Sequence, residues 1–176
     1  VSIDLGVNNL CTMGSNVLKP TLINGKPLKS INQYYNKKLA NLKSKLINEK
    51  KTSKRIKSLT NKRNNKVNDY LHKTSRLITN YLVSNNINTL VVGKNKEWKQ
   101  DVNIGKKNNQ NFVQIPHSRL IDMISYKCKI EGIFVIITEE SYTSKCSFLD
   151  DEGIKKQKSY KGKRIKRGLF ETKEKR

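Results

Sequence analysis

A long basic segment in which apolar residues follow a helical repeat limits the possible folds of this chain more than any other stretch. Residues 36–80 contain fourteen Lys and Arg residues and two acids. Apolar residues recur at helical spacing first over residues 39–47 and then over residues 56–82. This spacing places them on one face of each helix. We therefore expect a basic helical hairpin over about residues 34–84, which is too highly charged to form a core by itself.

The rest of the charge lies mainly in one other place. Residues 155–176 contain eleven Lys and Arg residues and two acids, so the two basic segments hold 21 of the 23 net positive charges. The remainder is nearly neutral and is typical of a folded scaffold. Nucleic-acid phosphates are the natural partner of such basic regions. An anionic membrane surface would favour a basic amphipathic helix with aromatic anchors instead. We expect a DNA or RNA partner and no membrane.

Membrane-spanning and secreted proteins are excluded by other features. No apolar run approaches the roughly 18 to 20 residues of a membrane span. The first residues lack the basic and apolar regions of a secretory signal. The three cysteines, Cys11, Cys128 and Cys146, are far apart and odd in number, which is typical of a reducing compartment. We expect a cytoplasmic, bacterial-type protein associated with the nucleoid.

Before the hairpin, the sequence predicts three short strands. Apolar residues alternate over residues 1–5, and similar patterns follow over residues 10–13 and 17–23, separated by Gly and Asn turns. Short strands joined by tight turns favour an antiparallel meander. Tyr34 and Tyr35, at helical spacing with later tyrosines, are expected in the core.

After the hairpin, strand and helix alternate. Residues 89–92 are an apolar run typical of a buried strand, and residues 133–137 form an uninterrupted apolar strand. Residues 116–130 have a helical repeat that begins at a proline. Residues from Ser141 onward are expected to be irregular. Parallel strands joined by helical crossovers, added to a meander, form a ribonuclease H-like α/β fold with a mixed sheet.

Acids at the ends of two expected strands are candidate metal ligands. Asp4 lies within the first strand, where a carboxylate either faces solvent or binds a cation. Glu139 and Glu140 follow the strand at 133–137, which by topology would lie near the first strand. Because side chains alternate, only one of the two can face Asp4. Clustered carboxylates hold two Mg²⁺ ions in nucleases, but such a centre needs three or four acids.

Several motifs resemble the TnpB/OrfB family of insertion-sequence proteins. The opening IDLGVNNL is similar to the first RuvC motif of that family. The other motifs are GKNKEWKQ at 93–100, NNQNFVQIP at 108–116, TEESYTSKC at 138–146 and GKRIKRGLF at 162–170. The resemblance implies a RuvC-like nuclease domain of a transposon-encoded, RNA-guided DNA endonuclease. It also implies Mg²⁺ or Mn²⁺ as cofactor, and DNA and guide RNA as partners.

The resemblance implies roles for single acidic residues. Asp4 matches the first catalytic aspartate and metal ligand. Most members carry a glutamate at the position of Gly93, but a branch of the family places it just before the Tyr-Thr-Ser-Lys motif, where Glu140 lies. Glu139 is the alternative ligand. We therefore expect Asp4 and Glu140 to be the catalytic metal ligands.

Basic residues of the hairpin, the motifs and the tail are expected to contact phosphates, which positions a nucleic acid without reading its bases. Trp98 lies among lysines and either stacks on a base or covers an edge of the core. The expected nucleic-acid-binding residues are Lys54, Arg55, Lys62, Arg63, Lys94, Lys96, Trp98, Lys99, Lys145, Lys163, Arg164, Lys166 and Arg167.

Two departures from the family pattern argue against a complete enzyme. Relatives carry a Cys-x-x-Cys zinc ribbon that begins at the position of Cys146, but here the sequence is CSFL. We expect no zinc, because a structural site needs four ligands. The segment after Phe170 does not match the continuation that holds the third catalytic aspartate in relatives. We therefore expect a RuvC-like domain at residues 1–145, followed by a degenerate zinc-ribbon region and basic tail at 146–176.

These observations predict a truncated, impaired member of the nuclease family whose intact relatives cut DNA with two metal ions. The alternatives are a catalytically inactive basic module that binds DNA or RNA, and a decaying transposase remnant.

Overall fold

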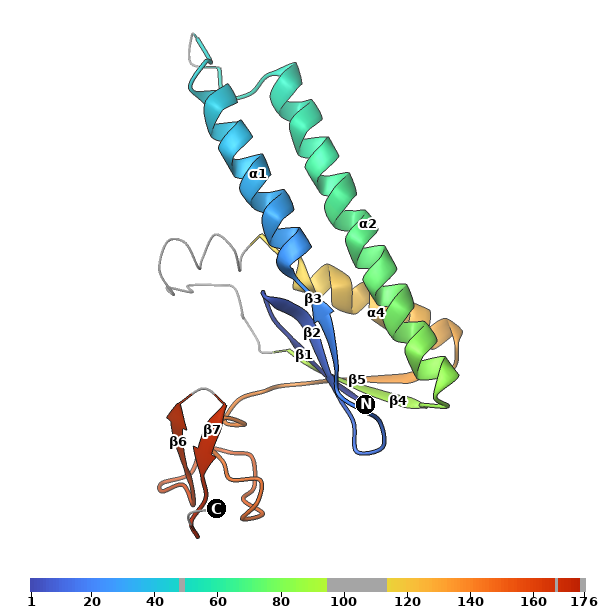
Figure 1. The fold of residues 1–176 in the computed structure, drawn as a ribbon, viewed down its shortest axis with the longest axis vertical. Coiled ribbons are helices and arrows are strands. Elements are labelled where there is room, and N and C mark those ends of the chain that lie inside the picture. The colour runs from blue at the N-terminus through green and yellow to red at the C-terminus, as the bar shows by residue number, and fades with distance from the viewer. Residues whose placement is uncertain (48–49, 95–113, 167, 175–176) are drawn as a thin grey trace. The chain divides into compact units, whose positions relative to one another are not determined.

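The computed structural model describes residues 1–47, 50–94, 114–166 and 168–174 (Figure 1). The chain divides into two compact units. The first comprises residues 1–93 and 97–137, and the second comprises residues 94–96 and 138–176. The boundary expected at residue 145 therefore lies inside the second unit.

The first unit contains a mixed five-stranded sheet with the strand order β3-β2-β1-β4-β5 (Figure 1). The predicted meander is present, because β1 and β2 pair antiparallel, as do β2 and β3. β4 pairs parallel with the other side of β1. The strands are β1 (Ser2–Leu5), β2 (Asn9–Gly14), β3 (Thr21–Asn24), β4 (Thr89–Gly93) and β5 (Phe134–Thr138).

The last strand of this sheet, β5, lies beside β4. The Phe134 amide donates to the Asn88 carbonyl, and the Lys94 amide donates to the Thr138 carbonyl, each at 2.9 Å. The two strands therefore run in the same direction. β5 is an edge strand, separated from β1 by β4.

The apolar strand predicted at residues 133–137 is confirmed as β5, but much of it is exposed. Phe134 is 74% exposed, and Ile136 and Ile137 are 51% and 52% exposed, whereas Ile133 is buried. An edge strand has a neighbour on one side only, so its side chains lose part of the cover that a central strand receives. The apolar run predicts the strand but not its place in the sheet.

The third strand begins later in the structure than the predicted range of residues 17–23. β3 starts at Thr21, whereas residues before it form a turn. The Ser15 hydroxyl accepts from the amides of Val17 and Leu18 at 3.1 and 3.2 Å, and Val17 is exposed. A side chain that takes up backbone amides in this way favours a turn over a strand.

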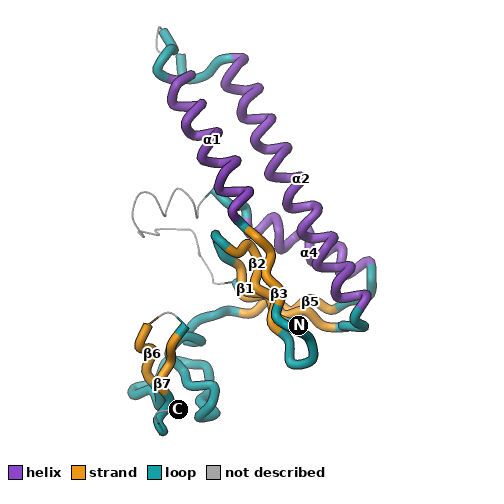
Figure 2. Tube along the Cα trace, in the orientation of Figure 1, coloured by secondary structure: helices purple, strands orange, loops and turns teal. Residues whose placement is uncertain are grey.

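The helical hairpin consists of α1 (Lys26–Lys43) and α2 (Lys54–Ser84), which lie side by side (Figure 2). α1 begins earlier than predicted, with Pro27 in its first turn, a position where a missing amide costs nothing. It also ends before Ile47, which was expected on the helix. At the start of α2, the Ser53 hydroxyl accepts from the Ile56 amide at 3.3 Å, as an N-cap does.

The core lies where the sheet meets the helices. Ile3 and Leu5 of β1 belong to one hydrophobic cluster with residues of α2 and of α4 (His117–Ile130). The cluster members from α2 and α4 are Val67, Leu71, Ile78, Leu82, Leu120, Ile121, Met123, Ile124 and Cys128, and Leu28 of α1 joins them. Ser2 and Asp4, which alternate with the buried residues of β1, are exposed. The face of the sheet that carries Asp4 is thus turned away from the core.

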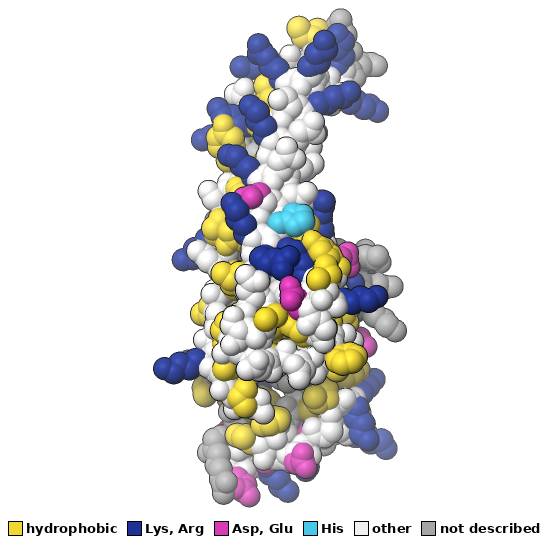
Figure 3. Space-filling view, turned by 90° about the vertical axis from the view of Figure 1, so that its right-hand side faces the viewer, with side chains coloured by type: hydrophobic (Ala, Val, Ile, Leu, Met, Phe, Trp, Pro, Cys, Tyr) yellow, Lys and Arg dark blue, Asp and Glu magenta, His cyan; other side chains and the backbone are white. Residues whose placement is uncertain are grey.

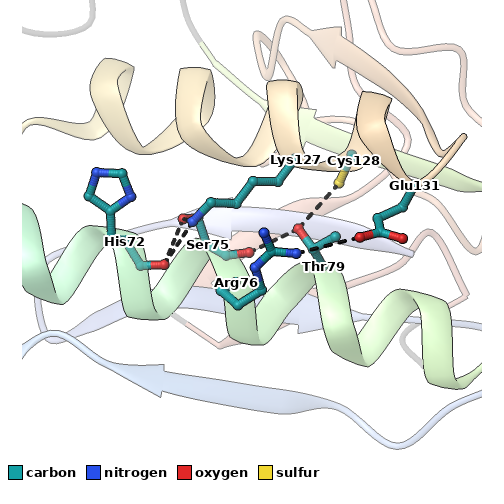
Figure 4. A network of polar contacts seen from close by, with 7 residues as sticks. All are labelled: His72, Ser75, Arg76, Thr79, Lys127, Cys128 and Glu131. Atoms are coloured by element: carbon teal, nitrogen blue, oxygen red, sulfur yellow. Dashed lines mark hydrogen bonds and ion pairs between the residues drawn. The ribbon is translucent and has the colours of Figure 1, made fainter.

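A polar network crosses the α2–α4 contact (Figure 4). The buried Lys127 ammonium donates to the His72 carbonyl at 2.9 Å and to the Ser75 hydroxyl at 2.6 Å. Burial, and then the nearby Arg76 charge, lower the pKa of Lys127. Arg76 in turn pairs with Glu131 at 3.4 Å. These contacts satisfy a buried cation that would otherwise destabilise the fold.

The second unit is not irregular, contrary to expectation. β6 (Lys163–Lys166) and β7 (Leu169–Glu171) form an antiparallel pair. The four side chains of β6 are all exposed. Because neither face of this strand is buried, its sequence lacks the apolar alternation by which a strand is predicted.

Two acidic side chains of the second unit accept hydrogen bonds from the surrounding loops. Glu152 accepts from the amides of Ser147 and Lys161 at 2.8 and 3.0 Å. Asp150 accepts from the Ser147 hydroxyl and from the Lys173 amide.

Candidate catalytic and nucleic-acid sites

Asp4 is placed by the pairing of β1 with its two neighbours. Its Cα partner on β2 is Thr12. On the other side, Ile3 pairs with Val92, and one residue further along this parallel register Asp4 lies beside Gly93. The carboxylate is on the exposed face of the sheet. The position at which most TnpB/OrfB members carry a glutamate is therefore next to Asp4, and here it has no side chain.

Cys11 lies in the same region of the sheet but is no candidate nucleophile or ligand. Burial, and then the charge of Asp4, raise the pKa of Cys11 to about 12. Both metal binding and nucleophilic attack require the thiolate. At neutral pH this side chain therefore remains a buried, uncharged thiol.

Glu139 and Glu140 follow β5 and belong to the second unit. The Glu139 carboxylate accepts from the Ser141 hydroxyl at 2.8 Å. The Glu140 carbonyl accepts from the amide and the hydroxyl of Thr143, at 3.3 and 2.8 Å. Asp4 belongs to the first unit, so its pairing with Glu140 stays a prediction.

The donor groups beside Asp4 fit a two-metal centre poorly within the first unit. In the described part of the chain, no three His, Cys, Asp or Glu side chains are grouped so that they hold a metal ion. A Mg²⁺ ion in such enzymes is typically bound by one or two carboxylates together with phosphate oxygens. Asp4 supplies one carboxylate, and Thr12 and Gly93 beside it supply none. The neighbours of Asp4 in the sheet therefore supply too few carboxylates for a two-metal centre.

Cys146, which the resemblance places at the start of a zinc ribbon, is buried in the second unit. Its thiol donates to the Lys155 carbonyl at 3.5 Å. The acids of this unit, Asp150 and Glu152, bind backbone amides and a hydroxyl group. Hydrogen bonds accepted by these two carboxylates thus connect the loops of this unit.

The predicted phosphate contacts of the hairpin divide into two kinds. Lys54, Arg55 and Lys62 project from α2 and are exposed. On the face seen in Figure 3, Lys and Arg side chains are frequent over the two long helices and acidic side chains are few. The single acid of α2, Asp69, pairs with Lys73 at 2.8 Å. The exposed cations thus create a positive surface.

Arg63 is different, because its guanidinium group is used within the fold. It donates to the Asn32 side chain at 2.8 Å, to the Gln114 carbonyl at 3.0 Å and to the Asn64 side chain at 3.0 Å. It also lies over the Tyr35 ring, 5.6 Å from its centroid. Arg63 therefore joins α1, α2 and the segment before α4, and we leave it out of the proposed phosphate contacts.

The second unit also presents basic side chains around shallow hollows. One hollow of about 340 Å³ is lined in part by Lys145, Lys163 and Arg164. The Lys145 ammonium lies 5.9 Å from the centroid of Tyr160 in its wall. Lys166 lines a neighbouring hollow of about 350 Å³. These four predicted cations therefore gather around the β6–β7 pair.

The remaining predicted nucleic-acid-binding residues lie outside the hairpin and outside strands β6 and β7. Lys94 is half-buried at the end of β4. The other four lie outside the described residues: Lys96, Trp98, Lys99 and Arg167.

In the described helices, no segment is long and apolar enough to span a membrane.

The sequence analysis missed one surface of the hairpin. Tyr34, expected in the core, is 60% exposed and lines a groove between α1 and α2, together with Lys66. Its neighbour Tyr35 is half-buried, as expected for a helix-contact residue. Adjacent residues of a helix point in directions about 100° apart, so helical spacing alone does not tell which tyrosine packs inward.

Comparisons with known proteins agree with this architecture. Residues 1–99 match the family model OrfB_IS605, described as a probable transposase. A TnpB-like protein of Methanocaldococcus jannaschii is 30% identical over 132 residues, which cover 74% of this chain and 47% of that protein. The chain thus spans about half the length of this curated relative.

Solved structures share the fold. The Cas12f1–sgRNA–target DNA complex contains a chain with a TM-score of 0.62 and 19% identity, over 82% of this chain and 36% of that chain. A CRISPR-Cas12f ternary complex gives a TM-score of 0.60 and 18% identity, over 83% and 30%. These likenesses confirm the predicted RuvC-like α/β fold with a mixed sheet, and the family model confirms the resemblance seen in the motifs. This chain belongs to the OrfB/TnpB family of probable transposases.

Proposed function

We propose that this chain is a nucleic-acid-binding domain of a RuvC-like nuclease, in which the α1–α2 hairpin holds a phosphate backbone. The observation that carries this proposal is the exposed row of Lys54, Arg55 and Lys62 on a helix with a single, already paired acid. Cations of this kind bind polyanions largely by releasing condensed counterions.

The proposed partners are DNA and guide RNA. The matched Cas12f1 chain is described in complex with sgRNA and target DNA. This description concerns that protein, and it supports the same classes of partner for a chain with the same fold and a net charge of +23.

Salt dependence of binding tests this proposal. We expect the Lys54→Glu/Lys62→Glu variant to bind single-stranded nucleic acid more weakly than the wild type. Its log–log salt slope should be smaller by about 1.4, since each lost single-strand phosphate contact removes about 0.7. Lys19→Glu/Lys129→Glu is the control, because it makes the same charge change at exposed residues outside the hairpin. An equal loss of affinity in both double variants, or binding that does not depend on salt concentration, would contradict the proposal.

For catalysis, we propose that Asp4 and Glu140 are the metal ligands, that Mg²⁺ or Mn²⁺ is the cofactor, and that cleavage by this chain is weak. Gly93 beside Asp4 supports the proposed weakness, because the carboxylate usual at this position is missing. A binding module without cleavage is the second candidate, and the same glycine favours it.

A plasmid-nicking assay with Mg²⁺ or Mn²⁺ separates these possibilities. If the assignment is correct, Asp4→Asn and Glu140→Gln abolish residual nicking, whereas Glu139→Gln leaves it. Nicking that survives Asp4→Asn would disprove the site. A wild type without any nicking, but with salt-dependent binding, would establish the binding module.

A further inference from the structure

The hairpin contains a groove that the phosphate contacts above do not explain. It has a volume of about 620 Å³, within the roughly 300–1,000 Å³ of small-molecule pockets. Its apolar wall is formed by Ile31, Tyr34, Leu42 and Leu59 from both helices. Four cations line it as well: Arg55, Lys62 and Lys66, and Arg63, whose guanidinium group is used within the fold. No acidic residue is among the described residues of this lining.

Polar contacts between α1 and α2 hold the helices in this arrangement. The hydroxyl groups of Tyr35 and Thr60 lie 3.1 Å apart, and Arg63 joins α2 to Asn32 of α1. Both contacts connect fixed positions of the two helices, so the groove beside them is part of the folded hairpin.

Tyr34 gives the groove an aromatic surface. Its side chain is 60% exposed, and the Lys38 ammonium lies 5.8 Å from the ring centroid. An exposed aromatic ring beside cations is the arrangement that binds single-stranded nucleic acids, because bases stack on the ring while flanking phosphates contact the cations. Duplex bases are already stacked on each other and are not available for this contact.

We propose that this groove binds one unpaired base of single-stranded RNA, stacked on Tyr34, with the adjoining phosphates on Arg55, Lys62 and Lys66. The proposal rests on the proposed nucleic-acid binding by the hairpin. Charge complementarity argues for a polyanion with an apolar face. RNA is favoured over DNA because unpaired, splayed-out bases are the usual targets of proteins in RNA loops and bulges. The hydroxyl groups of Ser30 and Ser58 in the lining also suit a ribose 2′-hydroxyl.

The test measures stacking directly. A short single-stranded RNA with one 2-aminopurine is titrated with wild-type protein, and its affinity and fluorescence quenching are recorded. We expect Tyr34→Ala to lose affinity by about tenfold and to lose the quenching, as expected for removal of one stacked base. Ser58→Phe, which places a large side chain in the groove from an exposed position, should have the same effect.

Tyr126→Ala is the matched control. Tyr126 is an exposed tyrosine of α4 that also has a lysine ammonium, that of Lys127, 5.8 Å from its ring centroid, but it does not line the groove. This variant should bind and quench as the wild type does. Circular dichroism melting checks that all variants remain folded.

The outcomes separate the two proposals. If the wild type binds RNA with a steep salt dependence but Tyr34→Ala and Ser58→Phe bind equally well, the groove proposal is wrong and the proposed function stands. If the wild type does not bind, both are wrong. If Tyr34→Ala weakens single-stranded DNA of the same sequence as much as RNA, the assignment to RNA is wrong.

Discussion

Asp4 of β1 lies beside Gly93 of β4, one residue beyond the paired residues Ile3 and Val92. Because the two strands are parallel, their C-terminal ends meet at the same edge of the sheet. A glutamate at position 93 would alternate onto the same face as Asp4. Under the proposed assignment of Asp4 as a metal ligand, glycine at position 93 leaves this edge of the sheet without a second carboxylate beside Asp4.

A carboxylate restored at this position should strengthen the site. We expect Gly93→Glu to raise metal-dependent plasmid nicking by at least roughly tenfold, because a second carboxylate beside Asp4 adds a ligand for the ion. Isothermal titration with Mn²⁺ should show tighter binding in the same variant. Gly93→Gln, which has the same size without the charge, is the control. Equal activity in the two variants would show that the added charge has no role.

Arg63 and its neighbour Lys62 should have opposite phenotypes. Arg63→Ala removes hydrogen bonds to Asn32 and Gln114, so we expect it to lower the free energy of unfolding by about 2 kcal/mol. Lys62→Ala, at an exposed position, should change it by less than about 0.5 kcal/mol but reduce the salt dependence of binding. Urea unfolding measures the first effect and filter binding the second. Equal stability of the two variants would contradict the structural role of Arg63.

Lys127 should make stability depend on alkaline pH. Its folded pKa is lowered, so in the window between that pKa and the ordinary value near 10.4 the unfolded chain binds more protons. Unfolding free energy should therefore rise with pH across this window. Lys127→Met replaces the ammonium with an apolar side chain and should flatten the rise. Thermal unfolding of both proteins over this range measures the difference, and parallel curves would rule out the contribution of Lys127.

Asp150 should make the second unit sensitive to acid. Its pKa is lowered, first by the Ser147 hydroxyl and then by the Lys173 amide. Its stabilising contribution is therefore complete above the ordinary pKa near 3.9 and is lost as the pH falls through the lower, folded value. NMR resonances of the Ser147 and Lys173 amides should follow this titration, and Asp150→Asn should abolish it. A zinc chelator should leave these resonances unchanged at neutral pH, whereas a change would reveal a metal site.

Local patterns in the sequence were sufficient for most elements. The apolar repeat that begins at residue 56 predicts α2, and Pro116 predicts the start of α4. The meander follows from alternating residues and tight turns, because these signals act between near neighbours in the chain. β6 escaped prediction because its four exposed side chains carry no apolar alternation. The basic surface of the hairpin was also evident, since it depends on composition rather than on packing.

The sequence by itself determined the family, the strand–helix order and the candidate Asp4, because motifs and periodicity are local properties. Features that depend on contacts between distant parts of the chain were decided only by the tertiary structure. The strand pairing brought Asp4 beside Gly93 and placed the apolar β5 at an exposed edge. The contact of α1 with α2 assigned Arg63 to the fold and left Tyr34 at a groove. Side chains of the same type and spacing receive different roles when only one of them meets a neighbouring element.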